Sequence, residues 1–315
     1  MAQIDLCFVW HMHQPFYKDL VTGEYKLPWT RLHGLKDYYG MVEILAAFPS
    51  IHQTFNLVPS MVAQLDEYAA GAAEDPFLRL ALKPAEELTD ADQAFLLRYF
   101  FQANLSRMVY RYPRYGELYE LSLKAGRFFG AQEFRDLQIL SQLAWFDEIF
   151  LAADPEIRDL VAKGRHYSLA DQKLMGRKQL EILGHVVPVY QKFAATGQIE
   201  VSTTPYYHPL RPLLCDSDNV RRLTALRNAV GRRVILFSGV DDLVLESALL
   251  GAEGWVSGLV NAFPDENRVL WQLAQQGRWA EARELYQWYT PLLHLDTKIK
   301  LVQYIKLCMA EVGLG

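Results

Sequence analysis

Two histidines at the end of a short apolar segment are the first candidates for chemistry in this chain. The segment Ile4–Pro15 reads IDLCFVWHMHQP and places His11 and His13 two residues apart. On a β-strand this spacing puts both imidazoles on one face, where they can hydrogen-bond a ligand or move a proton. The alternative is one buried histidine bonded to the backbone and one exposed histidine. The sequence offers no clear carboxylate or histidine to complete a metal site, so neither a metal nor a cofactor is expected.

A second polar cluster ends another apolar segment, Gly197–Leu214, which reads GQIEVSTTPYYHPLRPLL. Glu200 lies inside its apolar run, and a buried carboxylate is costly unless it is paired. Its presence predicts a ligand or, alternatively, an ion pair with an arginine on a neighbouring element. His208 follows two tyrosines after the strand end. The substrate-binding residues expected from these two segments are His11, His13, Glu200 and His208.

Acidic and basic residues further along the chain are weaker candidates. Asp241 and Asp242 follow the apolar run VILFSG, and Asp242 is well placed to cap the helix that begins LVLESALL. Glu200 and Asp241 are kept as candidate catalytic carboxylates. A Schiff-base site needs a desolvated lysine. The lysines of a late helix are instead expected to form a solvated face: Lys298, Lys300 and Lys306.

Positioning these residues requires strands, and five segments read as strands of a parallel sheet: 4–10, 51–57, 199–204, 234–237 and 255–260. Between the second and the third, almost every segment has the apolar periodicity of helices. A closed (β/α)8 barrel needs eight strands. The expected fold class is therefore α/β, an incomplete or distorted parallel (β/α) barrel with a large inserted helical region at about 61–195.

Parallel strands deliver their C-terminal ends to one edge of a sheet or to one mouth of a barrel. Three of the candidate residues lie at or near predicted strand ends: His13, Glu200 and His208. We expect them to meet in one cleft.

Composition limits the range of functions. The chain has 315 residues, 51% of them hydrophobic and 22% charged, and a net charge of −5, without a basic cluster. These values are typical of a globular protein and argue against a nucleic-acid partner. The three cysteines are scattered, which favours a reducing compartment and a cytoplasmic location. No signal peptide, membrane span or membrane partner is expected.

Residues 1–216 resemble glycoside hydrolase family 57, the retaining α-glucan enzymes that include amylases and glucanotransferases. The resemblance rests on His13-Gln14-Pro15, on LAWFDEIF at Leu143–Phe150, on KQLEIL at Lys178–Leu183 and on GQIEVSTTPYYHPLRPLLCDSD. It implies that the partner is an α-glucan or a maltooligosaccharide. It also implies that His13, Glu200 and His208 line a sugar-binding cleft, as the corresponding polar residues do in that family.

Residues 217–315 are similar to a different group, the C-terminal part of the dihydrodipicolinate synthase and N-acetylneuraminate lyase superfamily. The matching segments are DNVRRLTALRNAVG, ILFSGVDDLVLESALLGAEGWVSGLVNAFP and LYQWYTPLLHLDTKIKLVQYIKL. In that superfamily they form the last two barrel strands and the closing helices. The resemblance implies a second domain at 217–315, after a first domain at 1–216.

Both resemblances stop short of a complete site. The regions that carry the nucleophilic glutamate and the acid/base aspartate of family 57 are not recognisable, and retaining hydrolysis needs both carboxylates. Where the lyase superfamily has its Schiff-base lysine, this chain has Leu214-Cys215-Asp216. The change of family at 216–219 suggests a recombined, fused or mis-assembled gene. We therefore expect a family 57-like protein that acts on or binds α-glucans with impaired catalysis. The alternatives are a 2-keto-acid lyase or aldolase and a non-catalytic chimera.

Overall fold

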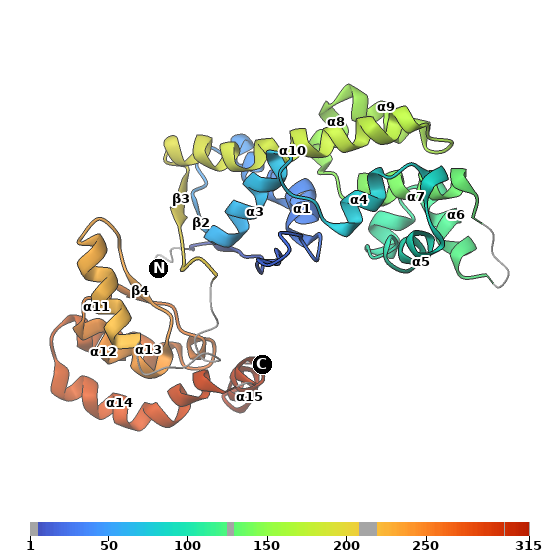
Figure 1. The fold of residues 1–315 in the computed structure, drawn as a ribbon. Helices are drawn as coiled ribbons and strands as arrows, with labels where there is room; N and C mark the ends of the chain where they lie inside the picture. The colour runs from blue at the N-terminus through green and yellow to red at the C-terminus, as the bar shows by residue number, and fades with distance from the viewer. Residues whose placement is uncertain (1–5, 125–128, 208–218, 299, 315) are drawn as a thin grey trace. The chain divides into compact units, whose positions relative to one another are not determined.

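Three short strands form a parallel sheet in the N-terminal unit of the chain, Met1–His208. The computed structural model describes residues 6–124, 129–207, 219–298 and 300–314 (Figure 1). The strands β1 (Val9–Met12), β2 (Gln53–Leu57) and β3 (Ile199–Ser202) lie in the order β1-β2-β3. Their register pairs Asn56 with both His11 and Ser202, so these polar residues lie on one face of the sheet.

The opposite face of this sheet packs on helices. Phe55 of β2 is fully buried, and its ring contacts Tyr190 of α10 edge-on, with the ring centres 5.3 Å apart. The helix α10 (Leu169–Ala195) is capped by Ser168, which exchanges hydrogen bonds with Asp171. This capping box fixes the start of a 27-residue helix that runs back to β3.

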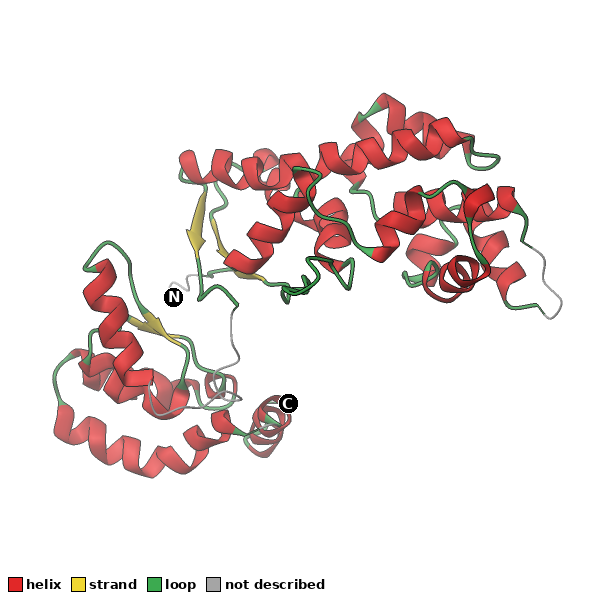
Figure 2. Cartoon of the chain, viewed as in Figure 1, coloured by secondary structure: helices red, strands yellow, loops and turns green. Residues whose placement is uncertain are grey.

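Helices fill almost all of the chain between β2 and β3, as the sequence predicts (Figure 2). The helices of the N-terminal unit are α1 (Trp29–His33), α2 (Gly40–Glu43), α3 (Pro59–Ala69), α4 (Pro76–Leu82), α5 (Asp90–Tyr99), α6 (Pro113–Ser122), α7 (Ala131–Leu143), α8 (Glu148–Ala153), α9 (Pro155–Lys163) and α10. A π-helical turn at Gly34–Tyr38 continues α1.

A fully buried ion pair joins the sheet region of this unit to its helical part. Arg31 of α1 donates to Asp75, which precedes α4, with its Nε 2.9 Å from Oδ2. The guanidinium also donates to Gln142 of α7 at 2.8 Å and to Gln179 of α10 at 2.6 Å. Tyr68 completes the set with a hydrogen bond to Asp75. The charge of Asp75 is thereby balanced inside the core, where an isolated carboxylate would be costly.

The C-terminal unit, Pro209–Gly315, has a smaller sheet and its own core. β4 (Phe237–Ser238) and β5 (Gly254–Trp255) form one parallel pair. Its helices are α11 (Asn219–Val230), α12 (Val244–Leu249), α13 (Pro264–Gln275), α14 (Trp279–Leu293) and α15 (Leu301–Glu311). Val244, Leu270 and Tyr289 are among the fully buried residues of its core.

The described residues thus contain five named strands, all paired in parallel, and each overlaps one of the segments that the sequence predicts. β2 and β3 lie inside their segments, β1 shares two residues with its segment, and β4 and β5 share one residue each. The first starts at Val9, later than predicted, and the last two have only two residues each. They form two separate small sheets, and no closed barrel is present in the described parts of the chain. The fold is helix-rich with short parallel sheets.

Candidate functional site

A row of polar side chains crosses the open face of the first sheet. His11 Nδ1 lies 2.8 Å from Asn56 Oδ1, and Asn56 Nδ2 donates to Ser202 Oγ at 3.0 Å. The ring of His11 stacks on that of His13, with centres 5.8 Å apart and planes 14° apart. Burial, together with the nearby His11, lowers the pKa of His13. A neutral His13 can both donate and accept a hydrogen bond.

The segment after β1 is held against helix α3. The side chain of Gln64, which is fully buried, accepts from the Tyr17 amide at 2.9 Å and donates to the Pro15 carbonyl at 3.0 Å. Gln14 donates to the hydroxyl of Tyr38 at 2.9 Å and accepts from that of Tyr17 at 3.1 Å. These bonds fix the backbone that carries the two histidines and connect it to the π-helical turn after α1.

Next to Tyr38 lies a cluster of aromatic rings and charged groups that we call the Trp29–Trp145 platform; it consists of Trp29, His33, Asp37 and Trp145. The two indole rings are 6.2 Å apart, and the His33 ring meets Trp145 edge-on at 5.5 Å. His33 Nδ1 lies 2.9 Å from Asp37 Oδ2. The side chains of His33 and Asp37 are 36% and 35% exposed, so solvent and ligands can reach them.

Asp37 of this platform and the nearby Asp147 have pKa values shifted in opposite directions. Burial alone would raise the pKa of Asp37, but hydrogen bonds from His33 and Lys36 outweigh it and lower the value. Burial raises the pKa of Asp147, although its oxygens accept from the amides of Gly40 and Ile149. Opposed shifts of this kind are typical of acid/base pairs in active sites. Here, however, every oxygen of Asp147 and Asp37 already has a protein donor.

The prediction that Glu200 is buried is wrong. Its side chain lies on the open face of β3 and is exposed to solvent, and the hydroxyl of Thr54 donates to it at 3.5 Å. The apolar run around Glu200 suggested burial on both faces, but the described residues cover only one face of this sheet at Glu200. His208 lies outside the described residues, so the expected cleft of His13, Glu200 and His208 stays a prediction.

In the C-terminal unit, Asp241 is buried, and several protein groups donate hydrogen bonds to it. Its carboxylate accepts from the indole of Trp255 at 3.0 Å and from the amides of Gly258 and Leu259 at 3.2 and 3.1 Å. The Asp241 amide donates to Asp296 at 3.1 Å. Burial raises the pKa of Asp241, and burial together with the nearby carboxylates raises that of Asp296 to about 6.

The predicted cap of α12 is also wrong. Asp242 lies inside a 3-10 turn, Asp241–Leu243, and Leu243 occupies the N-cap position without a side-chain hydrogen bond. The extra turn separates strand and helix by more residues than the sequence pattern suggested. The three lysines expected to be solvated are indeed exposed: Lys298, Lys300 and Lys306.

Sequence reasoning did not single out the Trp29–Trp145 platform. Trp29, His33 and Asp37 fall within one segment, LPWTRLHGLKD, at 27–37, and a helical repeat of four residues links the latter two. That repeat could have signalled an i,i+4 pair. The fourth member, Trp145, lies more than 100 residues away in LAWFDEIF, and nothing local connects it to the others.

Neither a metal site nor a membrane helix emerges from the described residues. No group of three or more histidine, cysteine, aspartate or glutamate side chains there could hold a metal ion. In the same ranges, no helix is long and apolar enough to cross a bilayer.

Comparison with known proteins divides the chain in two. Residues 7–234 match the family described as Glycosyl hydrolase family 57, and residues 215–315 match the Dihydrodipicolinate synthetase family. The 4-hydroxy-tetrahydrodipicolinate synthase of Persephonella marina is 32% identical over 74 residues, 24% of this chain and 25% of that protein. The synthase of Acidobacterium capsulatum is 30% identical over 97 residues, 31% of this chain and 32% of that protein. The chain thus spans about a quarter to a third of the length of these curated relatives. No solved structure matches it.

Proposed function

This chain belongs to glycosyl hydrolase family 57, and we propose that it binds an α-glucan or maltooligosaccharide chain without hydrolysing it efficiently. The binding surface proposed consists of the His11–His13 pair and the Trp29–Trp145 platform. The observation that carries the proposal is the platform itself, in which two indole rings lie beside a solvent-accessible His33–Asp37 pair.

The chemistry of this surface suits a sugar. The C–H faces of a pyranose ring stack on aromatic rings, and its hydroxyls pair with a few placed polar groups. In the platform, Trp29 and Trp145 supply the rings, while His33 and Asp37 supply the donor and acceptor. Gln14 and Tyr38 link this surface to His13.

The contacts and exposure of the carboxylates support the proposal that hydrolysis is weak or absent. Retaining hydrolysis needs two carboxyl groups about 5–5.5 Å apart, one as nucleophile and one as acid. Asp147 caps α8 and binds a second backbone amide, whereas Asp37 is held by His33 and Lys36. Glu200 is exposed, without the buried surroundings that tune a catalytic acid.

The binding proposal is tested by titrating the full chain with maltoheptaose in a calorimeter. We expect saturable binding that Trp145→Ala weakens at least tenfold. The matched control is Trp288→Ala, because Trp288 of the C-terminal unit is 62% exposed and lies outside the proposed surface. Absence of binding to the unmodified chain, or equal loss in both variants, would contradict the proposal.

Catalysis is tested with an activated aryl maltooside. We expect no release of the aryl group above background by the purified chain. Turnover that disappears in Glu200→Gln or Asp147→Asn would contradict the proposal that hydrolysis is impaired and would assign that carboxylate a catalytic role. A change in glucan binding alone releases no aryl group, so the titration and this assay measure binding and hydrolysis separately.

The match at 215–315 favours a second candidate, a 2-keto-acid lyase or aldolase. Such an enzyme forms a Schiff base through a desolvated lysine. Residues 209–315 contain three lysines, and all three are exposed. We therefore expect no covalent adduct after borohydride treatment with pyruvate, and a trapped adduct detected by mass spectrometry would favour the lyase.

The boundary and location of the protein are proposals as well. We place the junction of the two domains at 216–219, near the division of the compact units at 208–209 and inside the overlap of the family matches at 215–234. A cytoplasmic location is supported by Cys7 and Cys308, both free thiols. Sequencing the gene again across the junction tests whether it is real.

A further inference from the structure

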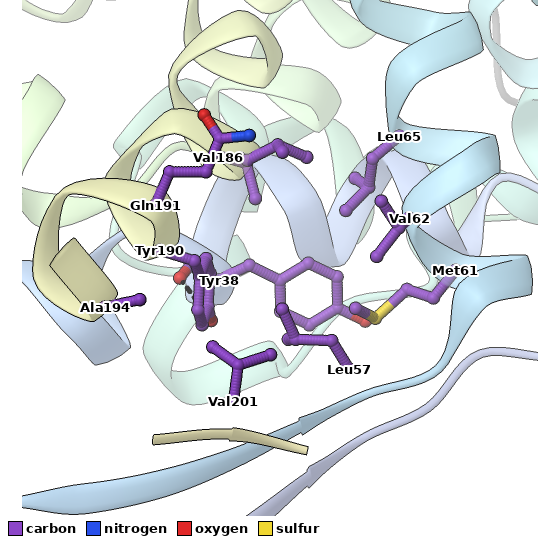
Figure 3. A pocket seen from close by; sticks show the side chains of 11 residues that line it. Tyr38, Leu57, Met61, Val62, Leu65, Val186, Tyr190, Gln191, Ala194 and Val201 are labelled. Carbon is purple, nitrogen blue, oxygen red and sulfur yellow. Dashed lines mark hydrogen bonds between the residues drawn. The ribbon is translucent and has the colours of Figure 1, made fainter. Parts of the chain in front are cut away.

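We propose that a cavity behind the first sheet binds a small uncharged apolar molecule, of the size of benzene or indole. The cavity has a volume of about 230 Å³ and lies between α3, α10 and the sheet face opposite the histidines (Figure 3). Apart from Tyr38, which also bonds to Gln14 beside the proposed glucan surface, the lining residues do not belong to that surface.

Aliphatic side chains from all three elements form the walls. The sheet contributes Leu57 and Val201, α3 contributes Met61 and Leu65, and α10 contributes Val186 and Ala194. Figure 3 shows these side chains around the ring of Tyr38. A wall of this kind favours an apolar ligand through the area that it removes from water.

The hydroxyl groups at the cavity are already engaged with the protein. The Tyr38 hydroxyl accepts from Gln14 at 2.9 Å, and the Tyr190 hydroxyl donates to the backbone carbonyl of Tyr38 at 2.9 Å. A buried water needs two to four polar partners, so water gains little by entering this space. A sugar or an ion would lose its hydration here without replacement.

Size points to a ring rather than a long chain. An apolar cavity of about 150 Å³ stays dry and binds benzene. The cavity in this chain is larger and can hold one or two fused rings. Its rim is accessible, because Val201 is 46% exposed and Gln191 is exposed as well.

The helix that forms much of the wall also has a weak point. Pro188 lies inside α10, between the lining residues Val186 and Tyr190. A proline cannot donate the amide hydrogen bond to the carbonyl four residues earlier, which here belongs to Gly184. This turn of the wall therefore lacks one backbone hydrogen bond.

The direct test uses the full chain with ¹³C-labelled methionine methyl groups and indole as the probe. The chain has seven methionines. Of these, Met61 lines the cavity and is 2% exposed. We expect its methyl resonance, assigned with Met61→Leu, to shift saturably with indole while that of Met309 stays in place. No saturable shift of the Met61 signal would overturn the proposal.

Cavity-filling variants give the second readout. Val186→Phe and Ala194→Leu should each weaken indole binding at least tenfold in a calorimetric titration, because they occupy the space. Val21→Phe adds the same ring at a position that is 96% exposed and should bind like the unmodified chain. Unchanged binding in a folded filling variant would place indole elsewhere and contradict the proposal. Since the methyl shift is read on the unmodified chain, the proposal stays testable if a variant does not fold.

Discussion

Asp75 in the N-terminal unit and Asp296 in the C-terminal unit are both nearly inaccessible to solvent, at 1% and 5% exposure. Their surroundings differ in charge. Asp75 is paired with the guanidinium of Arg31, whereas Asp296 accepts from a backbone amide and lies near Asp241 and Asp242. A cation balances the charge of Asp75, whereas burial and the neighbouring carboxylates raise the pKa of Asp296 to about 6. The two units should therefore respond differently to mutation and to pH.

The largest effect is expected from Asp75→Asn, which leaves Arg31 buried without its counter-charge. Breaking a buried pair in this way costs about 3–5 kcal/mol. Hydrogen exchange followed by mass spectrometry should show faster exchange in α1 and α7 and unchanged exchange in α13 and α14. Asp66→Asn on the exposed side of α3 is the matched control and should change neither. Equal loss of protection in both units would show that they do not respond separately.

Asp296→Asn tests the second half of the comparison. The folded pKa of Asp296, about 6, lies above the ordinary value of about 4, so the native state holds its proton more tightly than the unfolded state. Its contribution to stability is therefore greatest below pH 4 and is lost as the pH rises through 6. Between pH 4 and pH 7, we expect the free energy of unfolding of Asp296→Asn to rise relative to that of the unmodified chain by roughly 2–3 kcal/mol.

Denaturant unfolding of the C-terminal unit at each pH measures that difference. Asp265→Asn serves as the control because its side chain is 83% exposed. A constant difference between Asp296→Asn and the unmodified chain over this pH range would mean that Asp296 does not carry the pH dependence.

Gly40→Ala sharpens the comparison within the N-terminal unit, where backbone amides rather than a cation hold Asp147. A methyl group at Gly40 would collide with the Asp147 carboxylate that accepts the Gly40 amide. We expect a loss of about 1–3 kcal/mol, typical of overpacking. Gly184→Ala in α10 is the matched control, since its methyl group would meet no atom within 4 Å. Gly184→Ala should raise the free energy of unfolding by about 0.5–1 kcal/mol. Thermal unfolding of both variants measures these changes.

The smallest effect is expected for Glu200→Gln, which removes an exposed charge. Surface substitutions of this kind change the free energy of unfolding by about 0.5 kcal/mol or less. Urea unfolding measures it. A loss above about 1.5 kcal/mol would mean that Glu200 has a strong ionic partner in solution and would restore the prediction that it is buried and paired.

Local sequence patterns predict much of the secondary structure. Each segment predicted as a strand overlaps one, and two contain it, because short apolar runs that end in polar residues or glycine can be recognised from neighbouring residues alone. The helical stretch between β2 and β3 follows from its apolar periodicity in the same way. The Asp242 cap failed for a local reason too, since the sequence does not reveal where a 3-10 turn replaces the first turn of a helix.

What the sequence by itself determined is the approximate position of the strands and helices and the shared direction of the His11 and His13 rings, which are governed by residues close together in the chain. The tertiary structure alone decided the exposure of Glu200, the Arg31–Asp75 pair and the Trp29–Trp145 platform. Arg31, for example, bonds to Gln142 and Gln179, which are 111 and 148 residues away. Contacts at such separations depend on how helices pack over a sheet, and no periodicity within a short segment specifies which face of that sheet stays open.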